Sequence, residues 1–162
     1  MTEGQRSNWL ARRIGITGIG LTLIAAVVEF RPTSNDIQWR TYDQGVEEAK
    51  ATGKPMYVDV YATWCGPCKE MDRVTFRADS VRALLTSAYI PVRIDIDTKQ
   101  LSDSLKANWP IKAVPTSLIL AARGSVLGRR VGYQHPGEFV AWLTDSAIIA
   151  YAGWLDYAAA RQ

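Results

Sequence analysis

The chain has 162 residues, of which 48% are apolar and 22% are charged, and its formal net charge is +3. This composition describes one globular domain, and it excludes a disordered low-complexity chain, a collagen-like array and a chain with the strongly basic face of a nucleic-acid binder. Two cysteines and one histidine are too few for a disulfide-dense scaffold or a four-ligand zinc site, so we expect no metal and no cofactor.

An apolar run without a charge spans residues 14–28 and follows Arg12 and Arg13. As a helix these residues reach about 22 Å, which the preceding Trp9 and Leu10 bring closer to the ~30 Å hydrocarbon core of a bilayer. We interpret residues 1–30 as an uncleaved signal anchor rather than a cleaved signal peptide or a buried soluble helix, because the cleavage pattern is poor and three glycines weaken a soluble helix. Arginines before the run predict a cytoplasmic N-terminus and an exported remainder, hence an inner-membrane protein whose domain faces the periplasm.

A polar linker is expected over residues 31–36, and helices and strands alternate after it. Strands are predicted at 37–42, 56–61 and 89–96, and a hairpin joins strands 116–120 and 126–131 around Gly124. Helices are predicted at 42–52, where Gly53 ends the first of them, and at 67–75, 80–87, 101–108 and 137–159. The alternation predicts an α/β fold with a central mixed β-sheet flanked by helices.

Cys65 and Cys68 stand three residues apart, directly after the predicted strand 56–61 and at the start of the next helix. The first turn of a helix tolerates Pro67, and its unpaired N–H groups favour a thiolate at Cys65. We therefore expect a redox pair in which Cys65 is the nucleophile and Cys68, one turn deeper, is the resolving cysteine.

Three other uses of a cysteine pair at this spacing fit less well. A half zinc site lacks further ligands, and haem attachment needs a histidine where Lys69 stands. Two inert core thiols would not explain the setting of Trp64, Gly66 and Pro67 around the pair.

Asp59 lies within the predicted strand 56–61, among apolar neighbours. If its side chain is buried, loss of water raises the pKa of its carboxyl group. The alternative is an outward-facing carboxylate, because alternation along a strand places Asp59 on the opposite side from Val58 and Val60.

Residues 58–69, with the sequence VDVYATWCGPCK, closely resemble the active-site strand and helix of the thioredoxin family, and Val114-Pro115-Thr116 resembles its cis-proline loop. The resemblance covers roughly residues 37–143 and implies a thioredoxin fold. Residues 54–55, 71–76 and 97–115 are similar to those of membrane-anchored periplasmic members of the family, such as C-terminal domains of DsbD type. Residues 144–162 lie beyond the resemblance and are expected to form a C-terminal helical extension.

The resemblance also implies roles for single residues. Asp59 is expected to act as general acid or base for Cys68. Although most X-Pro peptide bonds are trans, the bond before Pro115 is expected to be cis, with the backbone of Val114 presented to an extended substrate segment. Trp64 would cover one flank of the disulfide, unless it is a core residue. Apart from the resemblance, Lys69 directly follows Cys68, and we expect its charge to assist the thiolate.

Arg93 and His135 each have two interpretations. Arg93 stands where thioredoxins carry a lysine near the buried aspartate, and a solvated charge at the sheet edge is the alternative. His135 precedes Pro136 in a turn, so it is interpreted as a structural or exposed residue.

The predicted C-terminal helix carries an apolar stripe at helical spacing, which includes Phe139, Leu143, Ala147, Tyr151 and Trp154. The stripe predicts either extra cover for the core or a docking surface for a membrane partner or a second subunit. Asp145 and Asp156 argue against a membrane span in this helix.

These observations predict a membrane-tethered thiol-disulfide oxidoreductase that reduces protein disulfides and receives electrons from a dithiol donor, for which a membrane protein is one candidate. Gly66-Pro67 between the cysteines is the dipeptide of reducing thioredoxins, and the cysteine pair of cytochrome c precursors is a substrate class suggested by analogy. The alternatives are a thioredoxin-like binding or assembly module and a disulfide oxidase or isomerase.

Overall fold

The structure is a computed structural model that describes residues 36–98 and 107–159, and side chains up to residue 153. The expected anchor at residues 1–30, nearly all of the linker at 31–36 and most of the helix expected at 101–108 lie outside the described residues. Within the ranges that are described, no helix is both long enough and apolar enough to cross a membrane.

The elements follow one another in an order that confirms most of the sequence prediction, with bounds that agree to within one residue. In chain order they are α2 (Tyr42–Thr52), β1 (Met56–Tyr61), α3 (Gly66–Glu70), the π-helix η2 (Met71–Thr75), α4 (Asp79–Ala88), β2 (Ile90–Asp95), β3 (Thr116–Leu120), β4 (Val126–Val131) and α6 (Pro136–Ala159). The single helix expected over 67–75 thus divides into α3 and η2, a change of helical type that the sequence pattern did not predict.

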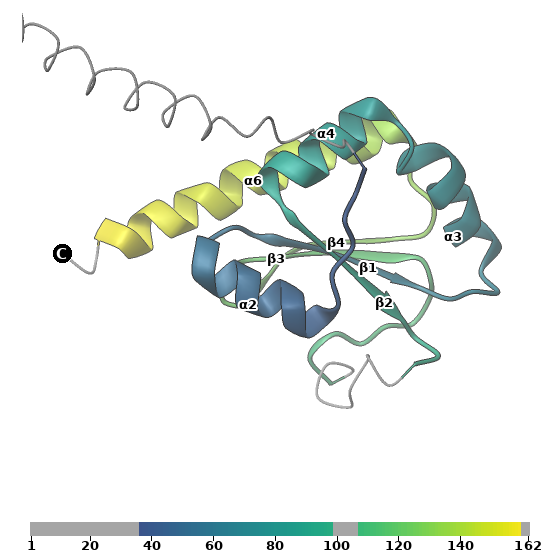
Figure 1. Ribbon diagram of the computed structural model, residues 1–162, viewed down its shortest axis with the longest axis horizontal. Coiled ribbons are helices and arrows are strands. Elements are labelled where there is room, and N and C mark those ends of the chain that lie inside the picture. Colours follow the sequence, from purple (N-terminus) through teal and green to yellow (C-terminus); the bar gives the residue numbers. More distant parts are fainter. Residues whose placement is uncertain (1–35, 99–106, 160–162) are drawn as a thin grey trace, which may run out of the picture. The chain divides into compact units, whose positions relative to one another are not determined.

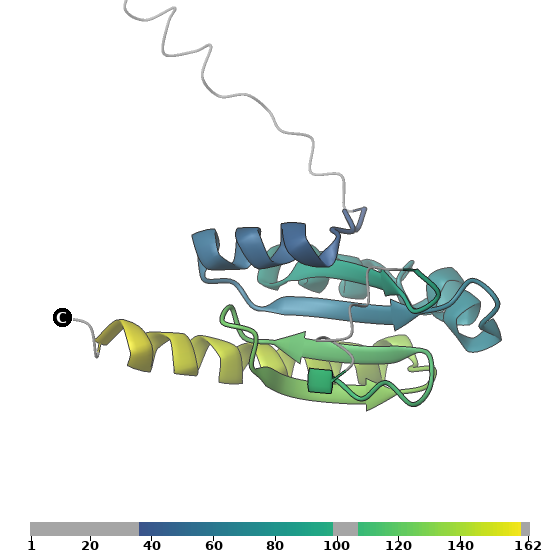
Figure 2. The same ribbon diagram turned by 90° about the horizontal axis from the view of Figure 1, so that it is seen from below.

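The four strands form one mixed sheet in the order β2-β1-β3-β4. β1 runs parallel to β2 and antiparallel to β3, and β3 pairs antiparallel with β4. Figure 1 shows α2 on one side of this sheet and α4 and α6 on the other, and Figure 2 shows the strands side by side from a second direction. The expected mixed sheet between helices is confirmed.

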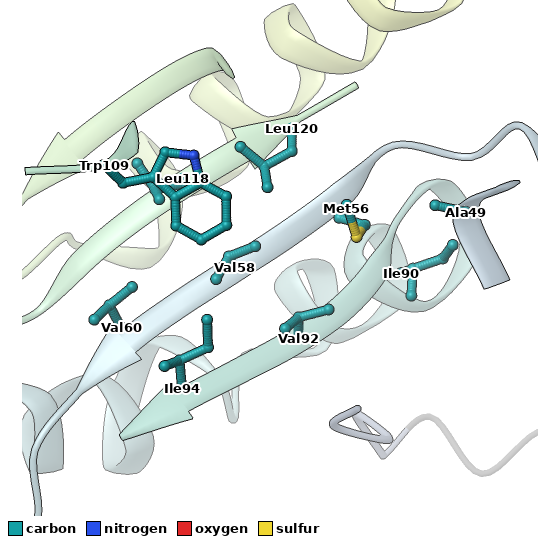
Figure 3. Close-up of a cluster of buried hydrophobic side chains, with 10 residues drawn as sticks. All are labelled: Ala49, Met56, Val58, Val60, Ile90, Val92, Ile94, Trp109, Leu118 and Leu120. Atoms are coloured by element: carbon teal, nitrogen blue, oxygen red, sulfur yellow. The ribbon is translucent and has the colours of Figure 1, made fainter. Parts of the chain in front are cut away.

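The central strand β1 is covered on both faces, so five of its six residues are fully buried. On one face, Val58 and Val60 pack with residues of β2, β3 and α2 (Figure 3). On the other face, Tyr57 packs with Met71 of η2 and Phe139 of α6. This two-sided burial explains why apolar residues occupy both faces of the strand instead of alternating with polar ones, with Asp59 as the exception.

The prediction of a strand at residues 37–42 is wrong, because this segment makes only one isolated bridge, between Arg40 and Val92. The Arg40 N–H donates to the Pro91 carbonyl at 2.9 Å, and the Arg93 N–H donates to the Arg40 carbonyl at 3.0 Å. The next bond of a parallel ladder would need an N–H on Pro91, which proline lacks. On the other side of the bridge, Thr41 already caps α2.

The helix α2 begins and ends at the signals that its sequence carries. Thr41 and Gln44 form a reciprocal capping box at its start, and Gly53 ends it in a left-handed conformation with φ of 73°. Gly45 allows α2 to approach β2, because a Cβ atom at this position would lie 2.3 Å from the Cγ2 atom of Val92.

The first half of α6 buries apolar side chains in the core, and the large apolar side chains described after it are exposed. Phe139 and Leu143 are fully buried, whereas Ile148, Ile149 and Tyr151 are 65%, 56% and 46% exposed. Figures 1 and 2 show this end of α6 running on past the sheet. The expectation of extra core cover is therefore met by the first half of the helix.

Candidate active site

Cys65 and Cys68 form a disulfide at the N-terminal end of α3. Cys65 is the residue that caps the helix, and its Sγ accepts a hydrogen bond from the Cys68 N–H at 3.1 Å. Pro67 lies in the first turn, as expected. Only 3% of Cys65 and 2% of Cys68 are exposed in this oxidised state, so exposure does not distinguish a nucleophilic cysteine from a resolving one.

A loop distant in the sequence lies against the cysteine pair. Val114 packs against the cluster of Ala62, Cys65 and Cys68, and the peptide bond between Val114 and Pro115 is cis. The next residue, Thr116, is buried and donates its hydroxyl to the Ala113 carbonyl at 2.7 Å. The structure therefore brings the two motifs together, and the pairing of Val114 with a substrate stays a prediction.

Trp64 is a surface residue, since 65% of it is exposed. Its Nε1 donates a hydrogen bond to Oδ2 of Asp97 at 2.7 Å, which ties the residue before Cys65 to the turn after β2. The alternative of a core tryptophan is therefore wrong. Gly66 and Lys69 are also exposed, and the expected assistance of Lys69 to the thiolate stays a prediction.

Asp59 is 1% exposed, which decides between the two orientations considered for it. Its side chain does lie on the opposite face from Val58 and Val60, but η2, α4 and α6 cover that face as well. Oδ2 of Asp59 accepts a hydrogen bond from Nε of Arg93 at 2.9 Å. Burial raises the pKa of this carboxyl group to about 6, although the nearby Arg93 charge acts to lower it.

Arg93 stands directly opposite Asp59 in the register of β1 and β2. Its guanidinium lies 4.3 Å from the ring centroid of Tyr61 and 5.0 Å from that of Trp39. A second nitrogen, Nη2, donates to Oδ1 of Asp72 at 2.5 Å. The alternative of a solvated edge charge is therefore wrong, since 20% of the side chain is exposed and both of these contacts are made within the fold.

Asp72 is not among the residues expected from the sequence. Its side chain is 44% exposed on η2, and Arg93 binds both Asp72 and Asp59. A signal was present in the position of Asp72 four residues after Cys68, because residues at this spacing share one face of a helix.

Glu70 and His135 make contacts with other residues. Glu70 forms an ion pair with Arg73 at 2.7 Å on an exposed helix face, and exposed His135 offers its carbonyl oxygen to the Phe139 N–H at the start of α6. Among the described residues, no group of three or more potential metal ligands comes together.

Comparison with known proteins gives a consistent set of relatives. A family profile described as thioredoxin-like matches residues 38–122. The thiol:disulfide interchange protein DsbD of Ralstonia nicotianae is 34% identical over 103 residues, which are 62% of this chain and 17% of that protein. The DsbD of Cronobacter sakazakii is 32% identical over 98 residues, again 17% of its length, so the chain matches about a sixth of these relatives.

One solved structure with the same fold is a thioredoxin from Thermus thermophilus, which has a TM-score of 0.64 at 20% identity and is matched over 71% of this chain and 90% of that chain. The C-terminal domain of DsbD from Neisseria meningitidis in its reduced form has a TM-score of 0.54 at 19% identity, over 65% of this chain and 97% of that chain. At these identities the likeness shows a shared fold.

Proposed function

Because the chain belongs to the thioredoxin-like family, we propose that it is a thiol-disulfide oxidoreductase that works through Cys65 and Cys68. Its thioredoxin-like domain resembles the C-terminal domain of DsbD. The observation that carries the proposal is the disulfide between these two cysteines at the start of α3, packed against Val114 of the cis-proline loop.

In the proposed reaction, the reduced Cys65 thiolate attacks a disulfide of a protein substrate. A mixed disulfide forms, and the first substrate sulfur leaves as a thiolate. The Cys68 thiolate then attacks the Sγ atom of Cys65, which releases the second substrate sulfur and closes the Cys65–Cys68 disulfide. Two electrons pass to the substrate, and a dithiol donor must return two electrons before the next cycle.

The surrounding groups support individual steps of this reaction. The N–H of Cys68 already donates to the sulfur of Cys65, which stabilises a thiolate there. Asp59 is proposed to accept the proton of the Cys68 thiol, because its raised pKa keeps it close to the working pH. The Val114 backbone is proposed to pair with an extended substrate segment, beside Pro115 and Thr116.

The direction and place of the reaction are the finer part of the proposal. Gly66-Pro67 between the cysteines favours a reductase. The apolar run of residues 14–28 after two arginines favours an anchor in the inner membrane, with residues 37–143 and the extension 144–162 in the periplasm.

A trapping experiment tests the exchange reaction. In Cys68→Ala the resolving thiol is missing, so substrates should stay bound to Cys65 as mixed disulfides that reducing agents release. The matched control is the double variant Cys65→Ala with Cys68→Ala, which should trap nothing. If Cys68→Ala captures no more protein than this control, the proposed function is wrong.

The direction is tested by equilibrating the full chain with glutathione mixtures and measuring the oxidised fraction. A reductase should have a potential near that of thioredoxin, about −270 mV, rather than near that of DsbA, about −120 mV. A value at the DsbA end would show an oxidase instead.

A binding or assembly module is the second candidate, favoured by the exposed apolar end of α6 at Ile148, Ile149 and Tyr151. The two functions differ in their dependence on the thiols. Cys65→Ser abolishes the function of an oxidoreductase and leaves that of a binding module unchanged.

A further inference from the structure

The carboxyl group of Asp59 is held by one of its two oxygens. Oδ2 accepts from Arg93, whereas Oδ1 is buried and has no hydrogen-bond partner. A buried carboxylate oxygen without a donor favours the protonated form of the acid, because the charge is neither solvated nor paired there.

Oδ1 of Asp59 has no partner because Arg93 donates to two different carboxylates, those of Asp59 and Asp72. An arginine commonly offers two parallel N–H groups to both oxygens of one carboxylate. Here Nε donates to Asp59 at 2.9 Å and Nη2 donates to Asp72 at 2.5 Å. Nη2, the nitrogen that would join Nε in a paired contact with Asp59, is thus directed to a carboxylate on another element.

The position of the guanidinium is fixed by its surroundings. Tyr61 and Trp39 have ring centroids 4.3 and 5.0 Å from it, and a third ring, Phe76, lies at 5.8 Å. The backbone of Arg93 is held on both sides, in register with Asp59 on β1 and in the bridge to Arg40. Because the guanidinium cannot move far, its choice of carboxylate oxygens depends on where Asp59 and Asp72 lie.

We propose that Asp72 is a positioning residue, which holds one nitrogen of Arg93 and so prevents Arg93 from binding both oxygens of Asp59. Asp59 is thereby kept able to exchange a proton. The consequence for catalysis rests on the proposed function, in which Asp59 accepts the proton of the Cys68 thiol. The sharing of Arg93 between Asp59 and Asp72 is independent of that function.

Few polar groups face Asp59, and one of them, Asp72, also raises the pKa of Asp59 directly through its charge. They are Tyr57 on β1, Arg93 on β2, Asp72 on η2 and the uncharged Ser117 on β3. Burial raises the pKa of Tyr57 well above its ordinary value, so Tyr57 is neutral at physiological pH. On α3, Cys68 is disulfide-bonded in the oxidised protein and does not titrate.

The test is a titration of Asp59 by carbon NMR of its carboxyl group, in the oxidised full chain. Asp72→Ala frees Nη2 of Arg93 for Oδ1 of Asp59, so the pKa of Asp59 should fall from about 6 towards its ordinary value. The matched control is Glu70→Ala, which removes the same charge from the preceding turn but breaks an ion pair with Arg73. An Asp72→Ala shift no larger than the control shift would overturn the proposal.

A double-variant cycle separates positioning from simple repulsion between the two acids. The charge of Asp72 also raises the pKa of Asp59 directly, so Asp72→Ala should lower this pKa somewhat even when Arg93 is absent. Arg93→Met should raise the pKa of Asp59 by about 1 to 3 units, and the fall caused by Asp72→Ala should be clearly smaller in that background than in the parent chain. An equal Asp72→Ala shift with and without Arg93 would show that charge alone acts, and it would overturn the proposal. If Arg93→Met does not fold, Arg93→Lys replaces it, since lysine lacks the paired donors and the same two outcomes apply.

The result is independent of the exchange reaction, because it is measured on the disulfide form without substrate. Failure of trapping by Cys68→Ala would remove the proposed function and leave the titration unchanged. Where exchange does occur, the pH profile for resolution of the mixed disulfide should move to lower pH in Asp72→Ala together with the pKa of Asp59.

Discussion

Asp59 makes the folded chain sensitive to pH. Burial moves the pKa of its carboxyl group from 3.8 to about 6, so the folded chain binds more protons than the unfolded chain between these values. Stability therefore falls as pH rises through this window, and the loss is complete above it. A difference of about two pH units corresponds to about 3 kcal/mol.

Replacing Asp59 with asparagine should remove this loss. We expect Asp59→Asn to be more stable than the parent chain at pH 7, by up to about 3 kcal/mol, and to lack the decline between pH 4 and 6. Urea unfolding of the oxidised chain across pH 4 to 7 measures both effects. An unchanged slope would show that another group binds the proton.

The same variant separates stability from catalysis. With the proton acceptor gone, Asp59→Asn should resolve the mixed disulfide more slowly while its fold stays intact, and the difference from the parent chain should change with pH. Stopped-flow kinetics of disulfide reduction from pH 6 to 9 measures the rates. Identical kinetics in both proteins over this range would exclude a role for Asp59 in proton transfer.

The helix α6 combines two kinds of apolar surface on one element. Its first half places Phe139 and Leu143 in the core beside Tyr57 and Leu85, with no exposure. The large apolar side chains described after Ala147, those of Ile148, Ile149 and Tyr151, are exposed. The apolar stripe in the sequence is continuous, so its periodicity does not reveal where the sheet beneath the helix ends.

A pair of truncations should distinguish the two halves of α6. Leu143→Ala leaves a cavity in the core and should lower the free energy of unfolding by about 2 to 5 kcal/mol. Ile148→Ala, which is 65% exposed in the parent chain, should change it by at most about 0.5 kcal/mol. Urea unfolding compares them, and an equal loss for Ile148→Ala would mean that a partner surface covers this residue.

The sheet brings three separate parts of the chain to one edge. β1 and β2 are parallel, so the turns after both strands lie together and place Trp64 within hydrogen-bond distance of Asp97. β3 runs antiparallel to β1, so its first residue Thr116 and the preceding Val114 lie at the same edge. The candidate active site is therefore a consequence of strand direction.

Most of the helices and strands and the cysteine pair could be predicted from the sequence, because each is marked by residues close together in the chain. Helix-ending residues and periodicity located the four strands and, within the described residues, the helices, and the spacing of Cys65 and Cys68 identified the redox pair. The expected strand at 37–42 failed because its ladder depends on Pro91, about fifty residues further on.

The folded structure was needed wherever a property depends on residues distant in the chain. Strand alternation alone left Asp59 free to face water or protein, and packing of η2, α4 and α6 on its face buried it. Arg93 is 34 residues from Asp59 and 21 from Asp72, and neither pairing follows from a local pattern. The cysteine pair is thus recognised from a short local motif, whereas the ionisation of Asp59 is set by contacts that exist only after the sheet and helices have packed.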